Sequence, residues 1–170
     1  MSRNLDVMYS SVDMCWATPY DFFDKLDQEF HFDLDPCCDH FTHKCAHYYT
    51  KEDDGLSKDW GGHRVFCNPP YGSEISTWVE KCFIEGHKPN TIVVMLIPAR
   101  TDTRYFHEYI LNRSEIRFIR GRLKFGDGKN SAPFPSMLVI YRGPNIIENP
   151  YWNMIKESGA IRPISFGPRK

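Results

Sequence analysis

The sequence predicts an α/β fold of three layers, doubly wound and Rossmann-like, with a mixed sheet between helices. Residues 91–98 form a continuous apolar run, which is typical of a central parallel strand covered on both faces. Shorter strand patterns alternate with amphipathic helical patterns ahead of this run, and two further strand patterns follow it. With 170 residues, the chain is long enough for one domain with a three-layer core.

The composition is that of an ordinary globular protein, with 41% hydrophobic and 25% charged residues. No apolar run approaches the roughly 20 residues that span a membrane. Residues 1–6 lack the apolar core of a signal peptide. We therefore expect a cytoplasmic protein that binds no membrane and whose six cysteines are reduced thiols.

The net charge is only −1, but the charges are unevenly distributed. Residues 21–59 hold eleven acidic residues against four lysines, whereas residues 113–129 hold six lysines and arginines against two acids. A solvated surface could produce this pattern by chance. The alternative is one face for a cationic cofactor and another for a phosphate backbone.

The first helix is expected from residue 18 to residue 29, with residues 1–13 as a flexible arm and residues 14–170 as the single domain. Thr18 fits the N-cap, Pro19 the first helical position, and Asp21 the acidic first turn. The apolar side chains then recur at helical spacing, at Phe22, Phe23, Leu26 and Phe30.

Strands are expected at residues 32–35, 46–50 and 64–67. In a doubly wound sheet the carboxyl ends of the strands border the ligand crevice. Asp35 and the acidic turn of residues 52–54 are therefore candidate ligand contacts. The alternatives are a plain Asp-Pro turn and an exposed acidic loop.

Six cysteine and histidine side chains lie within eleven residues, at Cys37, Cys38, His40, His43, Cys45 and His47. Their spacing does not fit paired Cys-x-x-Cys and His-x3-5-His ligands. We expect no metal site, and a small zinc-binding protein is kept as an alternative.

The most informative stretch is Asn68-Pro69-Pro70-Tyr71, which follows the strand at residues 64–67. The two prolines fix the backbone and remove two donors, so carbonyl and amide oxygens of this turn are left as acceptors beside an aromatic ring. Such a turn suits a planar exocyclic amine, whose two hydrogens need two acceptors. The alternative is a proline-rich turn without a ligand.

The C-terminal half begins with a helix that starts at Ser73 or Ser76 and ends near Gly86. After the central strand, a short helix is expected at 104–111, and strands at 114–125 and 136–142 enclose a loop rich in glycine, proline and basic residues.

Asn68-Pro69-Pro70-Tyr71 resembles the Asn/Asp-Pro-Pro-Tyr motif of amino-group DNA methyltransferases. The wider chain resembles the small phage and prophage DNA N6-adenine methyltransferases of the Dam type over roughly residues 14 to 142. The segments that carry this wider resemblance, in order, are Trp16-Ala17-Thr18-Pro19, Asp33-Leu34-Asp35-Pro36-Cys37, Glu52-Asp53-Asp54-Gly55-Leu56, Pro98-Ala99-Arg100-Thr101-Asp102-Thr103, Gly121-Arg122-Leu123-Lys124-Phe125 and Ala132-Pro133-Phe134-Pro135-Ser136.

The resemblance implies a methyltransferase fold that ends in an antiparallel hairpin, and transfer of a methyl group from S-adenosylmethionine to the N6 amine of a flipped adenine in DNA. The implied catalytic residues are Asn68, Pro69, Pro70 and Tyr71. The implied cofactor contacts are Trp16, Thr18, Pro19, Asp35, Pro36, Asp53, Asp54 and Asn68. The implied substrate contacts are Tyr71, Arg100, Arg122, Lys124, Phe125 and Phe134.

Several alternatives stay open from the sequence. Phe125 or Phe134 could face Tyr71 across the base, and Arg100 could instead form a structural ion pair with Asp102. The acceptor could be cytosine N4, an RNA adenine or a protein glutamine, or the chain could be a non-catalytic DNA-binding module. We expect a monomer or weak homodimer, in the host cytoplasm if the chain is phage-encoded.

Overall fold

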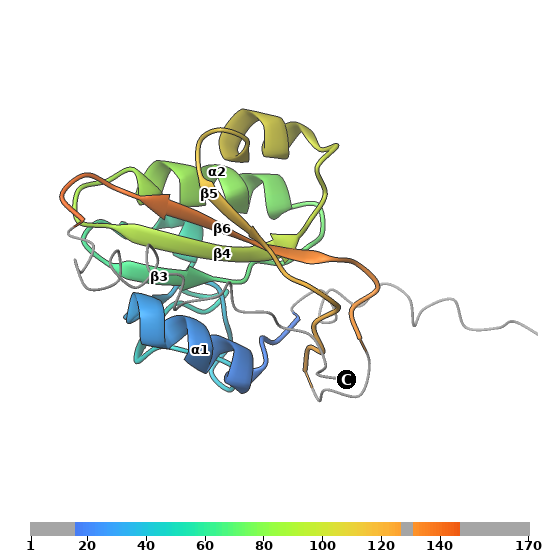
Figure 1. Cartoon of the computed structure of the whole chain (residues 1–170). Coiled ribbons are helices and arrows are strands. Elements are labelled where there is room, and N and C mark those ends of the chain that lie inside the picture. The colour runs from blue at the N-terminus through green and yellow to red at the C-terminus, as the bar shows by residue number, and fades with distance from the viewer. Residues whose placement is uncertain (1–15, 127–130, 147–170) are drawn as a thin grey trace, which may run out of the picture.

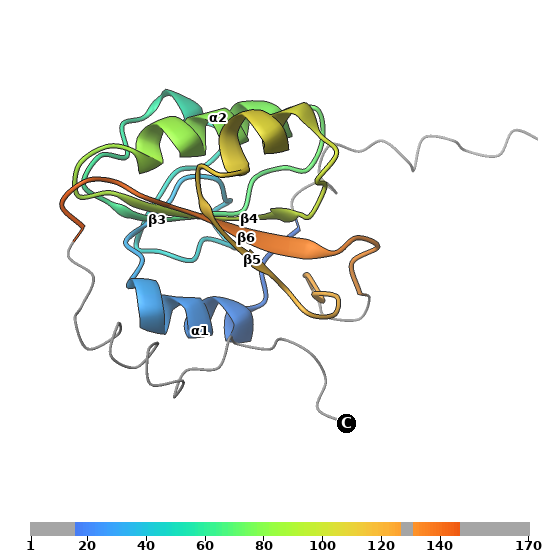
Figure 2. The same cartoon turned by 45° about the horizontal axis from the view of Figure 1, so that its top comes forward.

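The computed structural model describes residues 16–126 and 131–146. The predicted arm of residues 1–13 lies outside them. The described residues form a sheet between α1 on one face and α2 with a short π-helical segment on the other (Figures 1 and 2). The elements are α1 (Tyr20–Phe30), β1 (Leu34–Asp35), β2 (His47–Tyr48), η2 (Gly55–Ser57), β3 (Arg64–Cys67), α2 (Ile75–Gly86), β4 (Ile92–Pro98), η3 (Phe106–Ile110), β5 (Glu115–Phe118) and β6 (Ser136–Arg142). The predicted three-layer α/β architecture is confirmed.

The six strands follow the order β2-β1-β3-β4-β6-β5. β2, β1, β3 and β4 are parallel, whereas β6 pairs antiparallel with both β4 and β5. The predicted mixed sheet with a C-terminal antiparallel pair at one side is therefore present. Because β1 to β5 all point the same way, their carboxyl ends share one edge of the sheet, called here the carboxyl edge.

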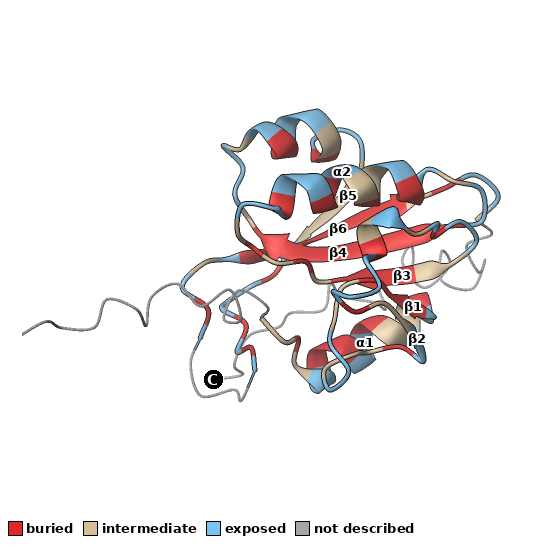
Figure 3. Cartoon of the chain, turned by 180° about the vertical axis from the view of Figure 1, so that it is seen from behind, coloured by how far each residue is buried: buried red, intermediate tan, exposed pale blue. Residues whose placement is uncertain are grey.

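The centre of the sheet is apolar because helices cover both of its faces. Every residue of β4 is buried, as is β6 except for its last residue (Figure 3). Phe66 of β3 contacts Phe23 of α1, with 5.1 Å between ring centroids, so even-numbered side chains of β3 face α1. Asn68 continues this alternation and therefore points to the α1 face at the carboxyl edge.

The start of α1 differs from the prediction. Pro19 has a ψ of 139° and is itself the N-cap, and the first helical bond runs from Phe23 N to Pro19 O at 3.0 Å. Thr18 therefore lies outside the helix and makes no capping bond. Its buried hydroxyl is instead available to the carboxyl edge.

Other element boundaries also differ. Neither Ser73 nor Ser76 caps α2, which begins at Ile75 behind Glu74. The predicted helix at 104–111 contains a π-helical segment, closed by a bond from Leu111 N to Phe106 O at 2.8 Å. The predicted strand at 114–125 ends at Phe118, because Gly121 soon follows with a φ of 83°, where a strand cannot continue.

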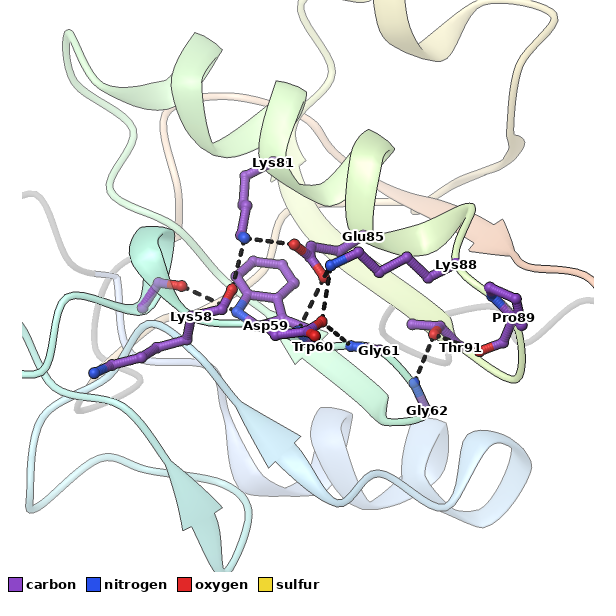
Figure 4. Close-up of polar contacts among 11 residues, drawn as sticks. Lys58, Asp59, Trp60, Gly61, Gly62, Lys81, Glu85, Lys88, Pro89 and Thr91 are labelled. Atoms are coloured by element: carbon purple, nitrogen blue, oxygen red, sulfur yellow. Dashed lines mark hydrogen bonds and ion pairs between the residues drawn. The ribbon is translucent and has the colours of Figure 1, made fainter.

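A buried ionic network lies at the opposite edge, where β3 and β4 begin (Figure 4). Glu85 of α2 is only 2% exposed and accepts from the Trp60 backbone N–H at 2.9 Å. Its carboxylate also pairs with Lys81 at 2.5 Å and Lys88 at 2.7 Å. Burial opposes ionisation, but these hydrogen bonds prevail and lower the pKa of Glu85 below its ordinary value.

We predict that Glu85→Gln lowers the free energy of unfolding by about 3 kcal/mol, because two ammonium groups lose their buried partner. Since the pKa of Glu85 is lowered in the folded state, its contribution is fully present above the ordinary glutamate pKa of about 4.3 and is lost as pH falls below it. Urea unfolding from pH 7 to pH 3 should therefore show the difference from the unmodified chain shrinking. The matched control is Glu108→Gln, whose partner Arg104 has an 88% exposed side chain, and its effect should be much smaller.

Candidate active site

The candidate site is built around the side-chain amide of Asn68, one residue beyond β3. Its Nδ2 donates to the Trp16 carbonyl oxygen and, at 2.9 Å, to the Thr18 hydroxyl. Its Oδ1 accepts from the Tyr71 hydroxyl at 2.6 Å. The amide nitrogen thus joins the segment before α1 to the end of β3, while the oxygen lies on the side of Tyr71.

Four aromatic rings pack together beside this amide. Trp16 lies 5.6 Å from both Phe125 and Phe134, between ring centroids. Tyr71 lies edge-on to the same two rings, at 6.3 Å from Phe125 and 5.5 Å from Phe134. We call Trp16, Tyr71, Phe125 and Phe134 the aromatic cluster. It brings together residues that the sequence analysis assigned to the cofactor, the catalytic turn and the substrate.

Within the aromatic cluster, Tyr71 is covered by its neighbours, and its exposed fraction is only 5%. Its hydroxyl oxygen also lies 3.2 Å from the Leu96 carbonyl oxygen of β4, a second acceptor to which its one hydrogen can turn. No base can stack on Tyr71 in this arrangement unless at least one neighbouring ring moves. Pro69 is buried and Pro70 half-buried between the amide and this ring, which keeps the turn short and firmly packed.

Asp35 ends β1 and is 3% exposed. Its Oδ2 accepts from the Lys44 N–H at 2.9 Å and its Oδ1 from the Cys37 N–H at 3.4 Å. Burial raises the pKa of this carboxyl, against the opposing effect of these backbone hydrogen bonds. Asp35 therefore holds the loop of residues 36–44 in place, and direct contact with a ligand stays a prediction.

The acidic turn follows β2 and is exposed at Asp53 and Asp54. Asp53 Oδ2 accepts from the Thr50 N–H at 2.9 Å and from its hydroxyl at 2.8 Å. These bonds lower the pKa of Asp53, so its carboxylate is ionised at neutral pH.

Close backbone packing fixes the acidic turn beside the loop after β1. A Cβ added to Gly55 would lie 2.0 Å from the Pro36 carbonyl oxygen, so only glycine fits there. The Gly55 carbonyl in turn accepts from the indole N–H of the buried Trp60 at 3.0 Å. The predicted cofactor residues Pro36, Asp53 and Asp54 are thus brought together.

Unpaired cations gather beyond the carboxyl ends of β4 and β5. Arg100, Arg122 and Lys124 are exposed, and their side chains make no hydrogen bond or ion pair within residues 16–126 and 131–146. The alternative ion pair of Arg100 with Asp102 is thus not formed there. Arg120 shares these properties and was missed as a candidate, although it lies in the basic stretch that the sequence analysis identified.

Two histidines of the cysteine- and histidine-rich stretch at residues 37–47 contact an aromatic side chain. His43 stacks on Tyr48 with ring centroids 4.1 Å apart, and His40 lies 3.1 Å from the Tyr48 hydroxyl. Among the residues that the structure describes, no group of three or more His, Cys, Asp or Glu side chains could hold a metal ion. The same part of the chain contains no helix that could cross a membrane.

Sequence reasoning missed two backbone acceptors of the site, the carbonyls of Trp16 and Leu96. Backbone groups have no residue type to reveal them, and both lie far from residues 68–71 along the chain. The tryptophan before Thr-Pro was a usable signal, but it was interpreted only as a cofactor contact.

Comparisons with known proteins all point to one family. The family model described as DNA N-6-adenine-methyltransferase (Dam) matches residues 7–153. The DNA N-6-adenine-methyltransferase of Haemophilus phage HP1 is 31% identical over 134 residues, which cover 74% of this chain and 77% of the phage protein. That of Escherichia phage T1 is 33% identical over 110 residues, which cover 64% of this chain and 45% of the relative.

We predict that Tyr71→Phe keeps the packing of the ring but lowers the free energy of unfolding by about 1 kcal/mol, because the one hydrogen bond that the hydroxyl donates, to Asn68 or to Leu96, is lost. Urea denaturation measures this difference. Tyr20→Phe is the matched control, since Tyr20 is 60% exposed, and it should leave the midpoint unchanged. Equal effects of the two variants would contradict the proposed hydrogen bonding.

Proposed function

The chain belongs to the DNA N-6-adenine-methyltransferase (Dam) family, and we propose that it transfers the methyl group of S-adenosylmethionine to the N6 amine of an adenine flipped out of DNA. The observation that carries the residue assignment is the side-chain amide of Asn68, held at the carboxyl edge by its nitrogen. Its oxygen is thereby available as an acceptor for the amine, as is the carbonyl of Pro69.

Donation of both N6 hydrogens to these acceptors draws the planar amine toward a tetrahedral nitrogen with an available lone pair. S-adenosylmethionine supplies an electrophilic methyl group on a sulfonium, which needs no general acid to leave. The methylated amine is strongly acidic, so its proton needs no strong base. Catalysis then depends on alignment and on fixed dipoles.

The aromatic cluster is the proposed base pocket. Tyr71 and one of Phe125 and Phe134 would stack on the flipped adenine, and the rings must first separate because Tyr71 is covered. Aromatic stacking on an extruded base contributes about 1–3 kcal/mol. The site therefore exchanges ring–ring contacts for ring–base contacts.

The residues around β1 and β2 fit the cofactor. The exposed carboxylates of Asp53 and Asp54 can accept from ribose hydroxyls, and Gly55 seats this turn against Pro36. Trp16 and Thr18 bond to Asn68, beside which the donated methyl group must be placed, and Pro19 follows Thr18 in the chain. Asp35 would act through the loop of residues 36–44 that it holds.

DNA is expected along the carboxyl edge. The side chains of Arg100, Arg120, Arg122 and Lys124 are exposed there without partners in the described part of the chain. At the opposite edge, Lys81 and Lys88 pair with Glu85, and Lys88 also pairs with Asp59. Unpaired cations release counterions on binding phosphates, so this edge is the favourable one.

The family match favours adenine in DNA over cytosine N4, an RNA adenine or a protein glutamine as acceptor. The predicted monomer or weak homodimer and the predicted cytoplasmic location stay predictions, as does the single domain of residues 14–170.

We predict that Asn68→Ala reduces methyl transfer by at least roughly 10²-fold, by analogy with the loss of one polar group from an oxyanion site. Transfer is measured with labelled S-adenosylmethionine and unmethylated DNA, followed by identification of the modified nucleoside. Cofactor binding, measured by calorimetry, should persist in the variant. Full activity of Asn68→Ala would contradict the proposed mechanism, and a product other than N6-methyladenine would contradict the proposed acceptor.

We also predict that Arg120→Gln weakens DNA binding and reduces the slope of log K against log salt by about 0.9, the value for one lost phosphate contact on duplex DNA. Arg113→Gln is the matched control, because Arg113 is also exposed but precedes β5 at the opposite edge. Fluorescence anisotropy between 50 and 200 mM salt measures both slopes. The same loss in both variants would show that DNA binding is not confined to the carboxyl edge.

A further inference from the structure

We propose that the Trp16 carbonyl and the Thr18 hydroxyl form an acceptor pair that fixes the orientation of the Asn68 amide and makes this position selective for asparagine over aspartate. The inference rests on the proposed function and extends it. It assigns Thr18, and the backbone of Trp16, as positioning groups that act on the reaction through Asn68.

The direction of the hydrogen bonds fixes the orientation of the Asn68 amide. A backbone carbonyl can only accept, so the group facing Trp16 O must be the amide nitrogen. The second hydrogen of that nitrogen is directed at Thr18 Oγ1, 2.9 Å away. Both donors of the amide are thus used on the side of the N-terminal segment. A flipped amide would set its oxygen against the Trp16 carbonyl.

The orientation of the amide determines where the side-chain oxygen of Asn68 lies. With the nitrogen fixed, Oδ1 must lie on the side of Tyr71, whose hydroxyl is 2.6 Å away. That hydroxyl has one hydrogen and two acceptors near it, Oδ1 and the Leu96 carbonyl at 3.2 Å. When an amine hydrogen reaches Oδ1, the hydroxyl can turn toward Leu96 without leaving its place. The amide therefore stays aligned while its partner changes.

Thr18 does not have the helix-capping role that is usual for a threonine at this position. A threonine before Pro at a helix start normally caps the helix, but Pro19 is the N-cap of α1 and no side chain caps it. Thr18 is nevertheless buried, with 4% of its surface exposed. Its hydroxyl accepts a hydrogen bond from the Asn68 amide instead of capping the helix.

The consequence for aspartate follows from charge. The motif that this chain resembles accepts either Asn or Asp, yet a carboxylate at position 68 would direct an anionic oxygen at the Trp16 carbonyl, with no hydrogen between them. Only the protonated carboxyl restores the bond to the Trp16 carbonyl, with its single O–H donating there and its carbonyl oxygen facing the site; the Thr18 hydroxyl must then donate to the carboxyl instead of accepting. Asn68→Asp should therefore be active only in its protonated form.

The test measures methyl transfer by Asn68→Asp at saturating cofactor and DNA from pH 8 to pH 6, each value divided by that of the unmodified chain. Division removes the titration of shared groups, which include the Tyr71 phenol and the Asp35 carboxyl at the end of the neighbouring strand. We expect the turnover ratio to be below about one hundredth at pH 8. It should rise by about tenfold for each pH unit lowered while pH exceeds the pKa of the new carboxyl.

Thr18→Val and Thr18→Ser provide the second measurement. Loss of one hydrogen bond of about 1.4 kcal/mol corresponds to a tenfold lower kcat in Thr18→Val, with a smaller change in KM for DNA. Thr18→Ser keeps the hydroxyl and should restore kcat to within a factor of about 2–3. Thr77→Val on the exposed side of α2 is the matched control, and its kcat should equal that of the unmodified chain.

The outcomes separate the inference from the proposed function. If the unmodified chain transfers methyl groups but Asn68→Asp has the same ratio at every pH, the acceptor pair does not select asparagine and the inference fails alone. Equal kcat values in Thr18→Val and Thr18→Ser would overturn the role of the hydroxyl. Absence of transfer by the unmodified chain would overturn the proposed function itself. Melting temperatures identify a variant that fails to fold, and the remaining variant then decides.

Discussion

The hydrogen bonds from the Asn68 amide to residues 16 and 18 are the interaction on which the rest of the site depends. They fasten a segment that belongs to no helix or strand against the end of β3. Trp16 thereby reaches Phe125 and Phe134, and through them the region before β6 is joined to the turn of residues 68–71. One polar side chain thus organises three parts of the chain that are distant in sequence.

The two edges of the sheet differ in how their charged side chains are paired. At the amino ends of β3 and β4, the buried Glu85 pairs with Lys81 and Lys88, and Asp59 pairs with Lys88 as well (Figure 4). Two carboxylates thus balance two ammonium groups, so this network stabilises the fold and presents little net charge. At the carboxyl edge the exposed arginines have no such partners among residues 16–126 and 131–146, while the acidic turn is fixed beside β1 by Gly55 and Trp60. The chain has a net charge of only −1, yet it carries its acidic turn after β2 and its exposed basic side chains after β4 and β5, so the two charges are separated along the carboxyl edge.

Much of the fold could be predicted because hydrophobic patterns report burial directly. The strands at residues 64–67 and 136–142 have the predicted bounds, and β4 differs by one residue from its apolar run. The role of Thr18 could not be predicted, since capping statistics describe neighbours in sequence, whereas its partner is fifty residues away. The strand predicted to reach residue 125 ends at residue 118, because Gly121 turns the chain and Phe125 instead packs against Trp16. For Thr18 and for the segment up to Phe125, contacts at the carboxyl edge outweighed the local preference for a helix cap and for a strand.

The central claim is that the Asn68 amide is held by its nitrogen, with both hydrogens engaged by the protein. Solvent exchange of the two Asn68 side-chain amide hydrogens, followed by ¹H–¹⁵N NMR and assigned by their loss in an Asn68 variant, tests this directly. We predict two separate resonances that exchange slowly in the free protein and remain slow when DNA is added. Rapid exchange of both hydrogens, as for an asparagine on an open surface, would contradict it.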